Sequence, residues 1–204
     1  PFSHEYIVAP PSLTVAATKM NLFYIGVDNP VSISVPGIAK ENIRPSISAG
    51  SISSDPNSRG NWIVRVPTGT RKAVISASAD YQGQMMNMGS AEFRVKKVPD
   101  PVAEIAGLVQ GSIEKNTLLA ASAIIPEMKD FEFDLYFRVV SFKMITIIGG
   151  DLVQKNARGN RFTEDMNSII KNARRKQKFF FQNIQATGPD GTTRSLNPIN
   201  LEIK

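Results

Sequence analysis

Hydrophobic and polar residues alternate in short runs along the first half of the chain. Residues 31–35 follow a strict two-residue period that ends at Pro36-Gly37, and residues 71–79 alternate in the same way. Turn residues such as Pro, Gly, Asn and Asp separate these runs from similar ones at 6–9, 12–18, 21–27, 43–48, 62–66 and 91–96. About seven or eight short strands at spacings of about 8–12 residues are typical of a sandwich of two packed sheets. We therefore expect residues 1–98 to form an antiparallel, immunoglobulin-like β-sandwich.

A proline-rich segment, Val98-Pro99-Asp100-Pro101, interrupts the pattern. Two prolines and an aspartate disfavour both a helix and a central strand at this point. We therefore predict a domain boundary here, with a short, stiff linker that limits the range of angles between the domains. The second domain, residues 99–204, is predicted to be β-rich with one or two short helices, so the whole chain is mainly β.

Residues 131–148 carry the most informative pattern of the second half. Phe131, Phe133, Leu135, Phe137 and Val139 share one strand face, and Val140, Phe142 and Met144 then occupy the opposite face. The change of side at Val139-Val140 indicates either a β-bulge or a strand that passes from one sheet to another. Further strands are expected at 179–186 and 196–203, with a hairpin turn at residues 188–191.

One helix is predicted near residues 163–175. Thr163 is a candidate N-cap, and Glu164 and Asp165 fall in the first turn, where the helix dipole favours carboxylates. Met166, Ile169, Ile170 and Ala173 follow at helical spacing, which predicts one face laid on a sheet. Residues 115–122 fit either a helix capped by Asn116 or a strand.

The composition excludes several classes of chemistry. With 42% hydrophobic and 21% charged residues the chain has a globular composition, and none of its apolar runs is long enough for a membrane span. It has no Cys and one His, His4, which lies close to Pro1, so thiolate nucleophiles, disulfides and multi-histidine metal sites are excluded. No nucleotide-binding or zinc-protease motif and no signal peptide is present. We expect no cofactor, and because the chain begins at Pro1 we expect it to be a piece of a longer protein.

The net charge of +6 is concentrated in one window. Between residues 155 and 178 only Glu164 and Asp165 oppose eight cations: Lys155, Arg158, Arg161, Lys171, Arg174, Arg175, Lys176 and Lys178. These eight are the candidate partner-binding residues, because a basic surface suits an acidic partner, nucleic acid or anionic headgroups. The plainer interpretation is a solvated loop and helix end. We favour a protein partner over nucleic acid, because the aromatic residues that follow Lys178 are predicted to lie in a strand.

Other candidates give weaker signals. Three carboxylates share one predicted strand face: Asp130, Glu132 and Asp134. Such a group could serve in glycoside hydrolysis or calcium binding, but the solvent-exposed face of an amphipathic strand explains it better. Trp62 is expected in the core. The Met-rich segment 84–89 is predicted to form a hairpin that either provides an adaptable contact or fills gaps at the end of the sandwich. Gly149-Gly150-Asp151 is expected to be a loop and not a phosphate cradle, because no helix begins directly after it.

Longer stretches resemble a known family. The segment TKMNLFYIGVDNPVSISVPG at residues 18–37 is similar to a characteristic segment of the GldM/PorM family of gliding-motility and type IX secretion proteins. The junction and last domain of that family resemble residues 93–101, 130–142, 159–163 and 188–199. The match covers nearly the whole chain in the right order. It implies that the chain corresponds to the two C-terminal periplasmic domains.

The resemblance implies a function that composition alone does not show. Family members are anchored in the inner membrane by an N-terminal helix that is missing here, form elongated homodimers across the periplasm, and drive secretion and, in some species, gliding. With a GldL/PorL-like inner-membrane protein they form a motor powered by the proton-motive force. The C-terminal end contacts a ring of PorK- and PorN-like proteins. No catalytic residue of the family falls on this chain.

We therefore expect a non-enzymatic, dimeric periplasmic shaft that links the inner-membrane motor to the outer-membrane-associated ring. It would contact the ring proteins through the C-terminal domain and the GldL/PorL-like protein through the missing N-terminal part, without nucleic acid and without membrane contact by these residues. The alternative is a carbohydrate-binding or sugar-processing β-sandwich, which rests on Asp130, Glu132, Asp134 and Trp62. A third class, nucleic-acid binding, rests on the basic window alone.

Overall fold

The alternating strands pair into sheets around two separate cores in the computed structural model, which describes residues 14–17, 21–81, 83–129, 131, 133 and 135–204. The chain divides into two compact units, residues 1–98 and 99–204, called unit 1 and unit 2 below. The strand expected at residues 6–9 and the carboxylates Asp130, Glu132 and Asp134 lie outside the described residues.

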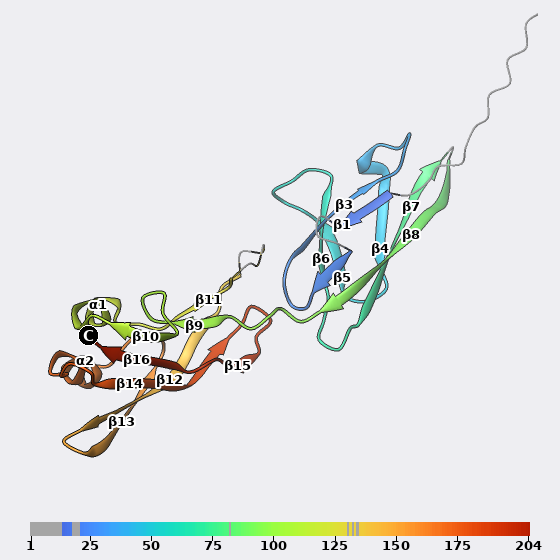
Figure 1. The fold of residues 1–204 in the computed structure, drawn as a ribbon. Coiled ribbons are helices and arrows are strands. Elements are labelled where there is room, and N and C mark those ends of the chain that lie inside the picture. The colour runs from blue at the N-terminus through green and yellow to red at the C-terminus, as the bar shows by residue number, and fades with distance from the viewer. Residues whose placement is uncertain (1–13, 18–20, 82, 130, 132, 134) are drawn as a thin grey trace, which may run out of the picture. The chain divides into compact units, whose positions relative to one another are not determined.

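Unit 1 is a sandwich of two four-stranded sheets (Figure 1), with strand orders β1-β3-β6-β5 and β2-β8-β7-β4. Its strands are β1 (Thr14–Ala17), β2 (Leu22–Tyr24), β3 (Asn29–Ser34), β4 (Ile43–Ile47), β5 (Ser51–Ser54), β6 (Asn61–Arg65), β7 (Lys72–Tyr81) and β8 (Gln84–Lys96), with a 3-10 turn, η1 (Lys40–Asn42), before β4. All pairs are antiparallel except β2 with β8. The two orders correspond to the A-B-E-D and G-F-C sheets of an immunoglobulin domain, which confirms the predicted topology.

Alternation along the strands builds the core of unit 1. Ala73, Ile75, Ala77 and Ala79 of β7 are fully buried, as their two-residue period predicts. They pack with residues of the other sheet such as Ile33, and Phe23 and Phe93 stack within their own sheet with ring centroids 4.3 Å apart. Each sheet therefore contributes one apolar face to a single layer of side chains.

One strand of unit 1 was not predicted: β5 lies between the strands expected at 43–48 and 62–66, and its Ile52 pairs with Val64. The Met-rich segment 84–89 lies in a hairpin, as predicted. It is the beginning of strand β8, which pairs with β7 out to Tyr81 and Gln84. Met88 is buried in the core, whereas Met85 and Met86 are exposed.

Unit 2 is built on one larger sheet. Its path runs β10-β16-β14-β12-β13, with β15 paired to β14, and a separate pair joins β9 to β11 (Figure 1). The bounds are β9 (Val102–Glu104), β10 (Gln110–Ile113), β11 (Ile125–Glu127), β12 (Arg138–Ile148), β13 (Asp151–Arg158), β14 (Lys178–Thr187), β15 (Thr193–Ser195) and β16 (Ile199–Ile203). The predicted turn at 188–191 joins β14 to β15, with Gly191 in the left-handed region at φ 74°. Strands β9, β10, β11, β13 and β15 were not predicted.

Two short helices cover one face of this sheet. Helix α2 (Glu164–Lys171) begins as predicted: the Thr163 hydroxyl accepts a hydrogen bond from the Met166 N–H at 3.3 Å. It ends at Lys171, before the predicted limit of 175. Residues 115–122, which fitted either a helix or a strand, form α1 (Lys115–Ala121), without a side-chain cap from Asn116. Leu118 of α1 and Ile170 of α2 are fully buried in the core cluster that includes Phe179 of β14.

The predicted long strand at residues 131–148 is shorter in the structure. Strand β12 begins at Arg138, and the described residues of 131–137 are not in a strand, so that part of the prediction was wrong. The change of side is confirmed: Val139 and Phe142 are both buried, and the register with β14 shifts on either side of Ser141. The strand stays in one sheet, so an irregularity of the bulge type explains the pattern.

No helix among the described residues is long and apolar enough to cross a membrane. The described residues also contain no group of three or more His, Asp or Glu side chains that could hold a metal ion.

Candidate functional site

The eight cations of the basic window lie at different places in unit 2. Lys155 and Arg158 are on β13, Arg161 precedes α2, and Lys171 is the last residue of α2. The structure brings four of them together at one shallow pocket: Arg174, Arg175, Lys176 and Lys178. We call these four the cationic rim.

The remaining cations lie apart from this pocket. The Lys155 ammonium binds the Asp165 carboxylate at 2.6 Å, so its charge is partly neutralised within the unit. Arg158 lies opposite Ser141 in the sheet, whereas Thr146 lies opposite Phe179, the neighbour of Lys178. Five residues of strand correspond to about 16 Å, so Arg158 is well separated from the cationic rim. The window is therefore not one continuous basic surface.

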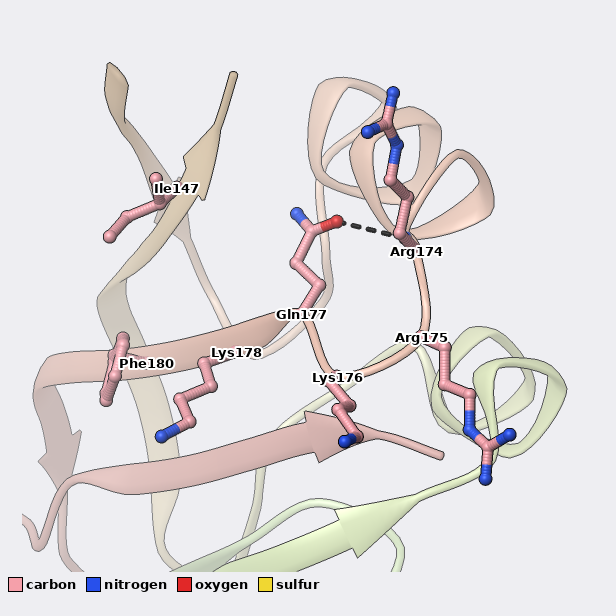
Figure 2. Close-up of a pocket in the computed structure, with 7 residues that line it drawn as sticks. All are labelled: Ile147, Arg174, Arg175, Lys176, Gln177, Lys178 and Phe180. Atoms are coloured by element: carbon pink, nitrogen blue, oxygen red, sulfur yellow. Dashed lines mark hydrogen bonds between the residues drawn. The ribbon is translucent and has the colours of Figure 1, made fainter. Parts of the chain in front are cut away.

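The pocket has a volume of about 420 Å³ and combines two kinds of side chain (Figure 2). Ile147 from β12 and Phe180 from β14 supply its apolar floor, and the cationic rim lies beside them. Ile147 is 57% exposed, which is unusual for a large aliphatic side chain in a strand. None of the described residues that line the pocket is acidic.

The loop that carries the rim has a fixed backbone. Lys176 has a left-handed backbone at φ 66°, which non-glycine residues seldom adopt. It is held there because the Lys176 N–H donates to the Ile203 carbonyl at 2.7 Å and the Ile203 N–H donates to the Gln177 carbonyl at 2.9 Å. The Gln177 N–H also closes a turn onto the Arg174 carbonyl at 3.1 Å. These bonds tie the loop to the final strand, β16.

Gln177 joins the loop to the interior of the sheet. Its Oε1 accepts a hydrogen bond from the Arg174 N–H at 3.1 Å (Figure 2), and its Nε2 donates to Thr146 Oγ1 at 3.0 Å. Thr146 is completely buried and donates in turn to the Lys178 carbonyl at 2.7 Å. A buried polar chain of this kind specifies one conformation because each unmade bond would be costly. The rim is therefore presented on a pre-organised loop.

The electrostatics of the rim are one-sided. Arg174, Arg175 and Lys176 are exposed, and none of them forms a salt bridge within the part of the chain that the structure describes. Lys178 approaches Glu202 at 3.9 Å, where 64% of its own side chain remains exposed. Arg175 and Lys176 also line a second hollow together with Glu114 and Glu202, so among the described residues only the side of the rim that faces Ile147 and Phe180 lacks carboxylates, and there the potential is positive.

The apolar floor continues across the sheet face that the helices do not cover. Ile147 pairs with Leu152 of β13, which is 62% exposed, and Ile145 pairs with Phe180 of β14. Since alternate residues of a strand share a face, these four side chains lie together on the side opposite the core residues Met144 and Thr146. We call Ile145, Ile147, Leu152 and Phe180 the apolar patch.

The other sequence candidates do not assemble into a site among the described residues. Trp62 is half-buried and packs against the core of unit 1, with its remaining surface facing a shallow pocket of about 480 Å³. That pocket contains both signs of charge, including Arg44, Arg59 and Asp55. Gly149 and Gly150 form the turn of the β12–β13 hairpin, as a loop assignment implies, and no helix follows them.

Sequence reasoning missed the apolar patch and the Gln177–Thr146 link. The exposed Ile147 was assigned to the interior of a long strand, and Leu152 belonged to no predicted element. A signal existed at residues 144–148, where the run Met-Ile-Thr-Ile-Ile has apolar side chains on both faces although a half-buried strand needs only one.

Comparisons with known proteins give two matches to family models. A model described as the GldM third domain matches residues 12–96, and a model described as the GldM C-terminal domain matches residues 99–204. No curated protein matches the chain.

Among solved structures, domains 6–7 of the surface layer protein SbsC are 9% identical over 94% of this chain and 98% of that chain, with a TM-score of 0.33. The SGBP-B protein of the Bacteroides ovatus mixed-linkage glucan utilization locus, in complex with a mixed-linkage heptasaccharide, is 9% identical over 97% of this chain and 46% of that chain, with a TM-score of 0.23. At these scores neither similarity bears on function.

Proposed function

The chain belongs to the GldM family, as the third and C-terminal domains of that family, and from this premise we propose that it is a force-transmitting shaft segment. Family membership makes the chain a component of the gliding and type IX secretion machinery, and it points to a structural, non-catalytic role. The C-terminal domains of GldM proteins are periplasmic in that machinery. The finer proposal is a homodimeric shaft that links an inner-membrane motor to an outer-membrane-associated ring.

The observation that carries the proposal is the short connection between the units. On the unit 1 side, the Ile25 N–H donates to the Lys96 carbonyl at 2.9 Å. On the unit 2 side, the Arg194 guanidinium donates to the Pro99 carbonyl at 3.4 Å and to the Asp100 carboxylate at 2.9 Å. Only Lys97 and Val98 lie between these two fixed points. A connection of two residues has little slack, which suits a part that must transmit displacement.

The partners follow from the same proposal. PorK- and PorN-like ring proteins would bind unit 2, and a PorL/GldL-like inner-membrane protein would bind a part of the protein that precedes this chain. The cationic rim supports a contact on unit 2, because three of its exposed cations, Arg174, Arg175 and Lys176, have no salt-bridge partner among the described residues and so favour a partner of opposite charge.

The test is a flexible insertion in the full-length protein in cells. Ten Gly and Ser residues placed between Lys97 and Val98 are expected to leave the protein folded and abundant while type IX secretion falls strongly, because a slack joint absorbs displacement. The matched control places the same residues between Asn57 and Ser58, in the exposed turn before β6. Normal secretion with the linker insertion would disprove the shaft proposal.

A further inference from the structure

We propose that the pocket in unit 2 binds an extended protein segment in which acidic and apolar side chains alternate along one face, that is, at every second residue. The cationic rim would bind the carboxylates, and the apolar patch would take the apolar side chains. The inference rests on the proposed function, since it gives the chemistry of the partner that unit 2 would meet.

The first argument is the short distance between the apolar and the cationic side chains of the pocket. Phe180 and Lys178 are two residues apart on β14, so they share the uncovered face of the sheet, and both line the pocket together with Ile147. An occupant must therefore present an acidic and an apolar side chain on one face, about 6–7 Å apart. Alternate residues of an extended segment do this, because residues i and i+2 point to the same side at that spacing.

The second argument is charge complementarity. Three of the rim cations have no salt-bridge partner within the described residues, and no lining residue carries a negative charge. Arginine donates two parallel hydrogen bonds to a carboxylate, so Arg174 and Arg175 suit Asp or Glu side chains. Lys155, by contrast, is already bound to Asp165 and is not part of the proposed site.

The third argument is the exposed apolar area at the same place. Ile147 and Leu152 form a cross-strand pair that is more than half exposed, and Ile148 at the hairpin turn is 45% exposed. Apolar side chains gathered beside cations mark an interaction surface more clearly than isolated exposed residues do. An apolar contact at the centre and charged contacts at the edge are the usual arrangement of a protein interface.

The same features disfavour nucleic acid and membranes as occupants. A nucleic-acid strand needs cations that follow its backbone and aromatic rings on which bases stack. Here Arg158 lies about 16 Å along the sheet from the rim, and the one aromatic ring of the pocket, Phe180, is half-buried in the sheet.

The test measures binding of a fluorescent heptapeptide, Glu-Ser-Leu-Ser-Glu-Ser-Leu, to the 204-residue chain, by fluorescence anisotropy in low salt. Arg174→Glu and Arg175→Glu are each expected to weaken binding about tenfold, which corresponds to about 1.4 kcal/mol. Ile147→Ser is expected to weaken it about three- to tenfold through the apolar contact. The controls are Arg158→Glu, the same charge change outside the pocket, and Ile125→Ser, an isoleucine of similar exposure on β11.

Several outcomes would overturn the inference. One is equal binding of a peptide in which serine replaces both leucines, which would remove the apolar contribution. Another is equal loss in Arg158→Glu and Arg174→Glu, which would show that only net charge matters. A third is tighter binding of a thymidine oligonucleotide or of phosphatidylglycerol vesicles that the same variants abolish. Since the linker insertion tests the shaft in cells without altering unit 2, each proposal can fail while the other stands.

Discussion

Asn29 and Tyr24 exchange two hydrogen bonds, as two residues facing each other in a β-ladder do. The Tyr24 N–H donates to Asn29 Oδ1 at 2.7 Å, and Asn29 Nδ2 donates to the Tyr24 carbonyl at 3.0 Å. The same amide nitrogen also lies 3.0 Å from the Val27 carbonyl and 3.1 Å from the Val64 carbonyl. One buried side chain therefore closes the turn between β2 and β3 and joins it to β6.

Unit 2 contains the same device. The Ala103 N–H donates to Asn197 Oδ1 at 2.8 Å, and Asn197 Nδ2 donates to the Ala103 carbonyl at 3.1 Å. In both units the residue after the asparagine is a proline, Pro30 or Pro198. A proline cannot donate a backbone hydrogen bond, so the preceding side chain supplies the pairing that the backbone at this point lacks.

Replacing Asn29 should destabilise unit 1 strongly. Asn29→Ala is expected to lower the free energy of unfolding by about 2–4 kcal/mol, because the Tyr24 N–H and several carbonyls lose their partner in a buried site. Asn29→Asp, which keeps the size but turns the donor into an acceptor, should cost at least as much. Urea unfolding followed by Trp62 fluorescence reports on unit 1, since the chain has one Trp. Asn57→Ala, at an exposed turn, should change it by less than about 0.5 kcal/mol.

Asp190 should make the stability of unit 2 depend on acid pH. Burial acts to raise the pKa of the Asp190 carboxyl, but the hydrogen bonds from Thr192 and the Arg194 guanidinium outweigh it, and the pKa is lowered from 3.8. A lowered folded-state pKa gives stability that is fully present above about pH 3.8 and is lost as the pH falls toward the folded-state value. Asp190→Asn should therefore cost about 1.5–3 kcal/mol at pH 7 and progressively less below pH 3.8.

Far-UV circular dichroism during denaturation at several pH values measures this difference, and Trp62 fluorescence in the same samples should not respond to Asp190→Asn. The control is Asp151→Asn at the exposed β12–β13 turn, which should change the stability of unit 2 at pH 7 by less than about 0.5 kcal/mol. A constant difference between wild type and Asp190→Asn from pH 7 to pH 2 would contradict the prediction.

Gln177→Ala separates the pre-organisation of the cationic rim from its charge. The change removes the bonds to Arg174 and Thr146 but no charge, and it is expected to cost about 1–2 kcal/mol of stability. Binding of the glutamate–leucine peptide should weaken about three- to tenfold, because the loop must then be ordered on binding. Nitrogen-15 relaxation should show increased motion at residues 174–176. Gln84→Ala, at an exposed glutamine of unit 1, should affect neither measurement.

Where one face of a strand is apolar and the other polar, the sequence was sufficient to predict the strand. The fully buried alanines and isoleucine of β7 are an example, as is the Thr163 cap of α2. Strands β5 and β13 escaped prediction because their own residues carry little pattern: Ser51–Ser54 is mostly serine, and β13 buries only Ala157. Both strands exist because neighbouring strands offer unpaired backbone groups, which is a property of the tertiary structure.

The candidate site was predictable in composition but not in geometry. Counting charges identified all eight cations, yet it could not separate Arg158 from Arg174. That separation depends on the register of β13 against β12 and on the path of the loop after α2. The left-handed backbone of Lys176 and the Gln177–Thr146 hydrogen bond result from contacts between residues about 30 apart in sequence. Local sequence propensity therefore cannot predict them.

Strand β16 lies inside the sheet of unit 2, parallel to β10 on one side and antiparallel to β14 on the other. Strand β10 therefore cannot pair with β16 until about 90 more residues have been synthesised. Long-range pairing of this kind forms slowly. While residues 199–203 are still inside the ribosome or a translocation channel, the edges of β10 and β14 stay open and able to pair wrongly. Unit 2 should thus need protection by a chaperone until its last strand is released.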